Sequence, residues 1–182
     1  MTNTKNNIKN KGTGAGGLKT NENGLPYEEL TDLVSEYTII SREKHHSNIK
    51  FVQGDKIFKV SKQANFFKCM KNNANDKIVK AHGCKNPDEC FIDEDKKVIF
   101  IIEKKFQQVP GSVCEKIQTP DFKIWQYSRT FPEYKIVYMY CLSDWFKTNC
   151  VSEIEYLNYK NVPIFWGTDA EYKNKIINFM LN

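Results

Sequence analysis

Two short segments hold the residues whose chemistry stands out: Pro87-Asp88, and Glu103-Lys104-Lys105 at the end of an apolar run. Side chains two apart on a strand share a face, so Glu103 and Lys105 are expected side by side. A preceding strand or turn can bring Asp88 beside Glu103, and two carboxylates together suit a hard divalent cation such as Mg²⁺. The ion would stabilise charge on a phosphodiester and acidify a water that Lys105 orients. The pattern therefore indicates metal-dependent phosphodiester hydrolysis.

The triplet also has a simpler, purely structural interpretation. Charged residues are common at strand ends, and a Glu-x-Lys triplet arises often in a chain with 27% charged residues. The context favours catalysis, because a Pro-Asp turn precedes the triplet and an apolar run leads directly into it. Asp93 is an alternative to Asp88, since it lies closer to Glu103 in the sequence. We favour Asp88.

Hydrophobic periodicity predicts the elements that must position these residues. The run of residues 98–102 is apolar on both faces, which is typical of a central strand covered from two sides. The expected elements are a helix over 27–37, a hairpin of 49–52 and 56–60, a helix over 61–81, strands over 90–93 and 97–106, a turn and helix over 112–129, a strand over 134–142, helix over 145–159, a short strand over 162–166 and a helix over 170–181. This order predicts an α/β fold with a mixed central sheet flanked by helices on both faces.

Residues 86–105 resemble the signature of the PD-(D/E)XK nuclease superfamily, with Asn86-Pro87-Asp88 at the start and Glu103-Lys104-Lys105 at the end. Two further segments resemble type II restriction endonucleases within that superfamily. Gly24-Leu25-Pro26-Tyr27-Glu28 is similar to a Gly-x-x-aromatic-Glu pattern, and residues 103–117 look like a strand-to-helix passage of such enzymes. The resemblance spans residues 12–145 and implies a restriction-endonuclease-like sheet.

By this resemblance, the chain would be a type II restriction endonuclease that hydrolyses double-stranded DNA with Mg²⁺. Asp88 and Glu103 would be the metal ligands, and Lys105 the water-activating or charge-stabilising group. The fold-level analogy also implies a homodimer, which suits cleavage of both strands of a symmetric site. A DNA methyltransferase acting on the same site would be the matching partner.

Two auxiliary positions follow from the same resemblance. Glu28 would be a further ligand or a ligand-orienting residue, although a solvated glutamate in a first helical turn is an equal interpretation. Glu29 competes for the same role. Gln107 is expected on the strand face of Glu103 and Lys105, where it would support the site.

The N-terminal residues 1–24 are expected to form a flexible arm and a Gly/Asn-rich loop, followed by a single nuclease domain over 25–182. In the loop, glycines would let the backbone approach phosphates, with Lys19, Asn21 and Asn23 reaching DNA. The alternative is a plain tether. The loop lacks the Gly-Lys-[Ser/Thr] ending of a nucleotide-binding P-loop.

Composition sets the broad class. The chain has 182 residues, of which 40% are hydrophobic and 13% aromatic, enough for one globular domain. The net charge of +5 is compatible with a polyanionic partner without requiring one. The sequence contains neither a transmembrane-length apolar run nor a secretory signal, so a soluble cytoplasmic protein is expected.

The six cysteines show no CxxC pair, so reduced thiols are expected. A zinc cluster of His82, Cys84 and Cys90 with Cys69 is the less favoured alternative, because short ligand pairs are missing.

Three other functions remain open at this stage. A structure-specific repair or junction nuclease of the same fold would recognise DNA shape rather than sequence. A non-catalytic DNA-binding module could retain the scaffold alone. In an unrelated α/β protein, the Glu103 triplet would be a solvated strand end, and Asp88 would not approach it.

Overall fold

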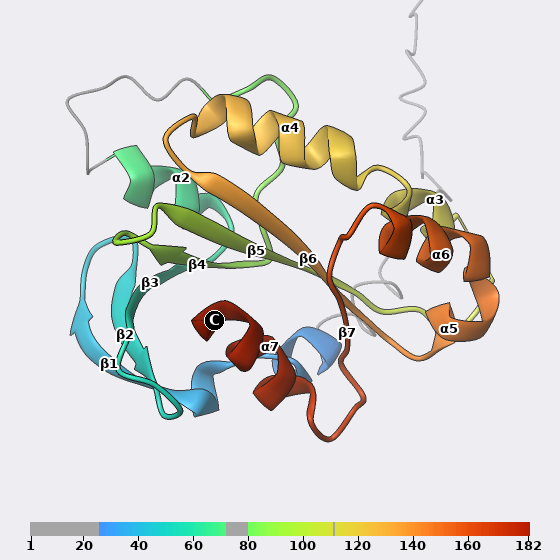
Figure 1. The fold of residues 1–182 in the computed structure, drawn as a ribbon, viewed down its shortest axis with the longest axis horizontal. Helices are drawn as coiled ribbons and strands as arrows, with labels where there is room; N and C mark the ends of the chain where they lie inside the picture. The colour runs from blue at the N-terminus through green and yellow to red at the C-terminus, as the bar shows by residue number, and fades with distance from the viewer. Residues whose placement is uncertain (1–25, 72–79, 111) are drawn as a thin grey trace, which may run out of the picture.

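A computed structural model describes residues 26–71, 80–110 and 112–182 of the chain. Its centre is a seven-stranded sheet whose strands are neighbours in sequence order, β1-β2-β3-β4-β5-β6-β7. Helix α4 crosses one face of the sheet and α7 lies against the other (Figure 1). The predicted α/β architecture, a mixed sheet flanked by helices, is confirmed.

The first five strands form an antiparallel meander. They are β1 Tyr37–Arg42, β2 Ser47–Phe51, β3 Ile57–Ser61, β4 Glu89–Asp93 and β5 Val98–Lys105. The β4–β5 hairpin turns at Lys97, which takes the left-handed backbone conformation with φ 52. The β2–β3 hairpin and the strand pair that leads to Lys105 agree with the sequence prediction.

The last two strands continue the sheet in parallel, β6 Lys135–Leu142 beside β5 and β7 Ile164–Trp166 beside β6. Parallel neighbours need crossover connections, and helices supply them. These are α3 Val113–Ile117 and α4 Pro120–Thr130 before β6, and α5 Trp145–Asn149 and α6 Val151–Tyr159 before β7. The chain ends in α7 Tyr172–Leu181.

Strand β5 separates two apolar cores. Ile99 and Ile101 belong to the core beneath α2 Ala64–Lys71, α4 and α6. Phe100 and Ile102 belong to the core on the α7 side. Because both faces are covered, the strand carries an uninterrupted apolar run, as the sequence predicted.

The N-terminal helix is shorter than the predicted 27–37. Helical structure covers residues 26–30, a 3₁₀ turn follows at Val34–Glu36, and β1 begins at Tyr37. Two polar side chains redirect the backbone: the Thr31 hydroxyl donates to the Tyr27 carbonyl at 2.7 Å, and Asp32 accepts the Val34 N–H at 2.8 Å. Such local side-chain bonds compete with helix continuation.

Other boundaries and one missed strand also differ. The predicted helix over 61–81 begins later, as α2 Ala64–Lys71, and residues 80–81 are not helical, while 72–79 lie outside the described residues. Strand β1 was not predicted, because it is an edge strand whose mixed polar and apolar residues are largely exposed.

Two of the six cysteines are not reduced. Cys114 and Cys150 form a disulfide across 36 residues of sequence, so the expectation of six free thiols is wrong for this pair. The four free cysteines are all buried: Cys69, Cys84, Cys90 and Cys141. The alternative zinc cluster around His82 does not form within the described part of the chain. In the same part, no helix has the length and apolarity to cross a membrane.

Candidate functional site

The β4–β5 hairpin brings the three predicted catalytic residues together. Glu89 pairs with Ile102, and one further step of this register places Asp88 beside Glu103. The Asp88 carboxylate accepts the backbone N–H of Lys104 at 2.8 Å, which fixes it against β5. The Lys105 ammonium lies 2.7 Å from Glu103 Oε1 and 3.9 Å from Asp88 Oδ2. Asp88 and Glu103 therefore approach each other, unlike in the solvated-strand-end alternative.

Lys123 is a fourth charged member of this cluster that the sequence analysis missed. It projects from α4, and its ammonium lies 3.5 Å from Glu103 Oε1. The same ammonium lies 5.4 Å from the ring centre of Tyr138 and 5.6 Å from that of Tyr140, on β6. In sequence Lys123 is one of many lysines, and only the crossing of α4 over β5 and β6 distinguishes it.

The four charges perturb one another because they share a partly buried space. Burial, and then the charge of Glu103, raise the pKa of Asp88. Burial also acts to raise the pKa of Glu103, but Lys105 and Lys123 outweigh it and hold that pKa below its ordinary value. Burial opposes the charge on Lys105, yet the two carboxylates keep its pKa raised. Glu103 and Lys105 thus form the stable ion pair at the centre of the cluster.

The position of the Lys105 ammonium tests whether these residues fit a divalent cation. Three oxygens surround it: Glu103 Oε1 at 2.7 Å, the Lys104 carbonyl at 3.1 Å and Asp88 Oδ2 at 3.9 Å. A positive group therefore already lies among hard oxygen donors, the kind that Mg²⁺ prefers. These donors are of the kind that would fit Mg²⁺, and Lys105 would have to give up this position for an ion to occupy it.

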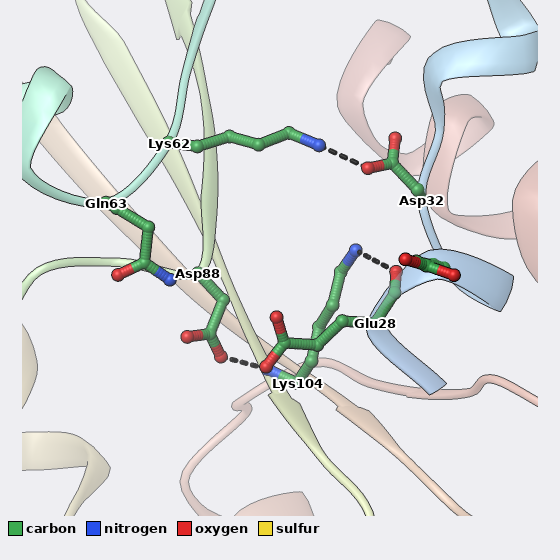
Figure 2. A pocket seen from close by; sticks show the side chains of 7 residues that line it. Glu28, Asp32, Lys62, Gln63, Asp88 and Lys104 are labelled. Carbon is green, nitrogen blue, oxygen red and sulfur yellow. Dashed lines mark hydrogen bonds and ion pairs between the residues drawn. The ribbon is translucent and has the colours of Figure 1, made fainter. Parts of the chain in front are cut away.

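Glu28 lies on the other side of Asp88. With Glu29 and Asp88 it lines a cavity of about 170 Å³, whose other lining residues are Asp32, Lys62, Gln63 and Lys104 (Figure 2). Burial and the charge of Asp88 raise the pKa of Glu28. The Glu28 backbone carbonyl accepts a hydrogen bond from the Lys104 ammonium at 3.2 Å. Glu28 is thus near Asp88, but within the described residues no three carboxylates gather with oxygens within 4.8 Å of one another.

Close packing fixes the helical segment that carries Glu28. Tyr27 is buried, and its ring centre lies 5.2 Å from that of Phe106, just beyond the end of β5, with the two rings tilted. A side chain at Gly167, just beyond β7, would overlap the Tyr27 hydroxyl and Thr31. Glycine is therefore required at this close approach. The contact holds the segment against the end of β5, where the candidate site lies.

A buried ion pair underlies the site on the opposite face of β5. Lys104, whose side chain is 4% exposed, lies 3.1 Å from Glu89, whose side chain is 0% exposed. Glu89 also lies 3.5 Å from Lys62, which in turn pairs with Asp32. Glu89 and Lys104 alternate along the chain with Asp88, Glu103 and Lys105, so β4 and β5 direct this buried pair to the face opposite the candidate site.

The remaining predicted residues have other positions. Gln107 lies beyond the end of β5, where its side-chain amide donates to the Val109 carbonyl at 2.7 Å, so its expected place on the strand face is wrong. Asp93 lies at the far end of β4, opposite Val98, and pairs with Lys56.

The three residues predicted to reach DNA from the Gly-rich loop, Lys19, Asn21 and Asn23, lie outside the described residues. The chain matches no protein-family model, no curated protein and no solved structure.

Proposed function

We propose that this chain is a Mg²⁺-dependent endonuclease of the restriction type, cleaving phosphodiester bonds in double-stranded DNA. One observation carries the proposal: the Lys105 ammonium lies among oxygens of Asp88, Glu103 and Lys104 at the C-terminal end of β5, an inner strand of the mixed sheet. An arrangement of two carboxylates and a lysine on adjacent strands fits metal-assisted hydrolysis. The resemblance of residues 86–105 to the PD-(D/E)XK signature supports the restriction-endonuclease-like fold and the choice of DNA.

Asp88 and Glu103 would hold the ion, which supplies stabilisation of the negative charge that develops on the scissile phosphate. Asp88 is already oriented by its hydrogen bond from the Lys104 backbone. The Lys105 ammonium would redirect its hydrogen bonds from the carboxylates to the phosphate oxygens and the attacking water. Lys123 would add a second positive charge on the α4 side, since it already neutralises Glu103 from there.

The charge balance of the cluster suits an anionic substrate. Without metal, the two carboxylates are matched by the two ammonium groups of Lys105 and Lys123. Addition of a divalent cation leaves an excess of positive charge, which favours a phosphodiester. Glu28, across Asp88, would act on the orientation of that ligand. Lys19, Asn21 and Asn23 would contact the DNA backbone.

We further propose a homodimer that acts in the cytoplasm, in concert with a DNA methyltransferase of the same sequence specificity. Two-fold symmetry would present one cleavage site to each strand of a palindromic duplex. Light scattering of the protein on a short duplex that carries the mapped site would show two chains per duplex. One chain per duplex would contradict the dimer without affecting the cleavage proposal.

The first experiment is cleavage of unmethylated phage DNA with Mg²⁺ or with EDTA. Glu103→Gln and Lys105→Met should each lower the rate at least about 10²-fold, the scale on which a single group that stabilises the transition state acts. Lys97→Met is the matched control, because Lys97 lies at the other end of the same hairpin and its side chain is 51% exposed. Its rate should equal that of the wild type.

The products separate the possible functions. Discrete fragments that require Mg²⁺, Glu103 and Lys105 support a sequence-specific nuclease. Nicks confined to junctions or damaged sites would instead indicate a repair enzyme. Folded protein that leaves every duplex intact would refute catalysis and favour a binding module.

A further inference from the structure

The disulfide between Cys114 and Cys150 is part of a group of three metal-ligand side chains outside the candidate nuclease site. It joins α3 to the N-cap residue of α6, with the two Cα atoms 5.7 Å apart. Glu153, in the first turn of α6, completes the group. Its carboxylate oxygen and the two sulfurs all lie within 4.8 Å of one another.

The chemistry of this group is that of a zinc site. Zinc binds thiolates and carboxylates in small tetrahedral sets. Cys150, the N-cap residue of α6, and Glu153, in its first turn, are three residues apart and give the local ligand pair. Cys114 supplies a ligand from a distant element. The sequence shows no short cysteine pair here because the local partner of Cys150 is a glutamate.

Two further observations favour a ligand here. The Gln118 amide donates to Glu153 Oε1 at 2.9 Å, an orienting bond of the kind that supports metal ligands. A cavity of about 310 Å³ adjoins the carboxylate, lined by Gln118, Ser152, Glu153 and Tyr156. The cavity gives water access to the Glu153 carboxylate, and water is a common fourth ligand beside three ligands from the protein.

We propose that Cys114, Cys150 and Glu153 bind Zn²⁺ when the disulfide is reduced, so that the site is controlled by redox state. A thiol or phosphine reductant gives two electrons to the S–S bond, and each sulfur takes up one proton to form two thiols. Binding of Zn²⁺ then releases both protons and leaves two thiolates on the metal. In the oxidised state the sulfurs are bonded to each other, and neither can become a thiolate ligand.

Metal binding would replace one cross-link by another. The disulfide closes a segment of 36 residues that contains α4 and β6. When it is reduced, an ion bound to Cys114 and to the start of α6 would tie the same two elements together. The site therefore offers a way to keep α3 and α6 joined in a reducing environment, where disulfides do not persist.

The test compares the full chain in its oxidised and phosphine-reduced forms, after removal of metal, by titration with Co²⁺ and then Zn²⁺. The reduced form should bind one equivalent, with the thiolate-to-cobalt absorption band, and Zn²⁺ should displace the Co²⁺. The oxidised form should show no such band. The oxidised form is a matched control for metal binding by other cysteines, because the four buried cysteines are free in both forms. Equal binding by both forms, or none by the reduced form, would overturn the proposal.

Variants locate the site and guard against misfolding. Glu153→Gln keeps both cysteines and should weaken zinc binding at least about 10-fold, as loss of a ligand or of its support does. Glu155→Gln, an exposed glutamate on the same helix, should bind like the wild type. Zn²⁺ should also raise the melting temperature of the reduced form alone. Reduced protein that zinc neither binds nor stabilises, or a Glu153→Gln variant with wild-type affinity, would refute the assignment.

Discussion

The buried pair of Glu89 and Lys104 gives the sharpest prediction about stability. Lys104→Met and Glu89→Met each remove one charge while keeping an apolar chain of similar length in its place. In Lys104→Met the Glu89 carboxylate, 0% exposed, keeps only Lys62 at 3.5 Å as an ion-pair partner among the described residues. In Glu89→Met the Lys104 ammonium keeps its hydrogen bond to the Glu28 carbonyl at 3.2 Å. Both variants therefore leave a poorly compensated charge in the core.

The magnitude follows from the burial of both groups. Removing one partner of a buried ion pair costs about 3–5 kcal/mol, whereas replacing both by apolar residues is often neutral or stabilising. Because Lys62 still faces Glu89, we expect the lower end for Lys104→Met, about 3 kcal/mol. The free energy of unfolding of the double variant should lie within about 1 kcal/mol of the wild-type value. The coupling free energy between positions 89 and 104 should therefore exceed about 3 kcal/mol.

Acid should relieve the Lys104→Met defect. Burial raises the pKa of Glu89 even though Lys104 and Lys62 act against it. Removal of Lys104 raises this pKa further, so the folded variant retains a proton on Glu89 that the unfolded chain releases. The contribution of Glu89 to the stability of the variant is therefore fully present below the unfolded-state pKa and is lost as pH rises through the folded-state pKa. The difference from the wild type should shrink as the pH is lowered.

Urea unfolding followed by circular dichroism measures these free energies, in a domain whose total stability is expected to be about 5–15 kcal/mol. Lys97→Met is the matched control, since it breaks the Lys97–Glu94 pair, with side chains 51% and 28% exposed. It should cost less than about 1 kcal/mol. Single variants as mild as this control, or a double variant whose loss equals the sum of the single losses, would refute the reasoning.

Three further predictions concern the proposed Mg²⁺ site, the disulfide and acid stability. Mg²⁺ at about 100 times its dissociation constant should raise the free energy of unfolding by about 2.7 kcal/mol by mass action. In thermal melts, Asp88→Asn or Glu103→Gln should abolish this stabilisation by Mg²⁺. An unchanged stabilisation in either variant would contradict the assigned ligands. Reduction of Cys114–Cys150 without metal should cost up to about 4 kcal/mol, because the bond closes 36 residues; urea unfolding with and without reductant measures it, and equal midpoints would refute the estimate. Burial acts to raise the pKa of Glu94, but hydrogen bonds from two lysines and a tyrosine lower it to about 2. The stabilisation from Glu94 is present above its unfolded-state pKa and is lost as pH falls toward 2. Glu94→Gln should flatten the acidic part of the plot of unfolding free energy against pH. An unchanged fall in stability at acidic pH would contradict this prediction.

The sequence predicted those parts of the fold that depend on local pattern. The alternation of Glu103 and Lys105 and the apolar run before them predicted strand β5, and a Pro-Asp turn predicted where β4 would bring Asp88. These features depend on the two-residue period of a strand, which is visible in any sequence. The helix over 27–37 was wrong because Thr31 and Asp32 form hydrogen bonds to the backbone, and apolar periodicity does not report such bonds.

The missed residues share a different cause. Lys123 and the Cys114–Cys150 pair depend on where a helix lies relative to a strand or to another helix. That arrangement is a tertiary property, and one lysine or cysteine in sequence is the same as any other. For the cysteines, a reader of the sequence would look for a short spacing, whereas the contact joins residues 36 apart.

The position of Lys104 was predictable from local pattern in one respect and depended on tertiary structure in another. Strand alternation does predict that it points away from Glu103 and Lys105. The sequence does not show that this opposite face is buried at the strand end, because charged residues there are normally solvated. Strand alternation on β4 places Glu89 on the same face as Lys104. The two charges therefore meet where the segment that carries Glu28 covers the hairpin. Asp88, Glu103 and Lys105 each adjoin a member of this buried pair in the sequence. The candidate catalytic face is therefore backed, on the other face of the hairpin, by a buried ion pair that single-face motif matching cannot detect.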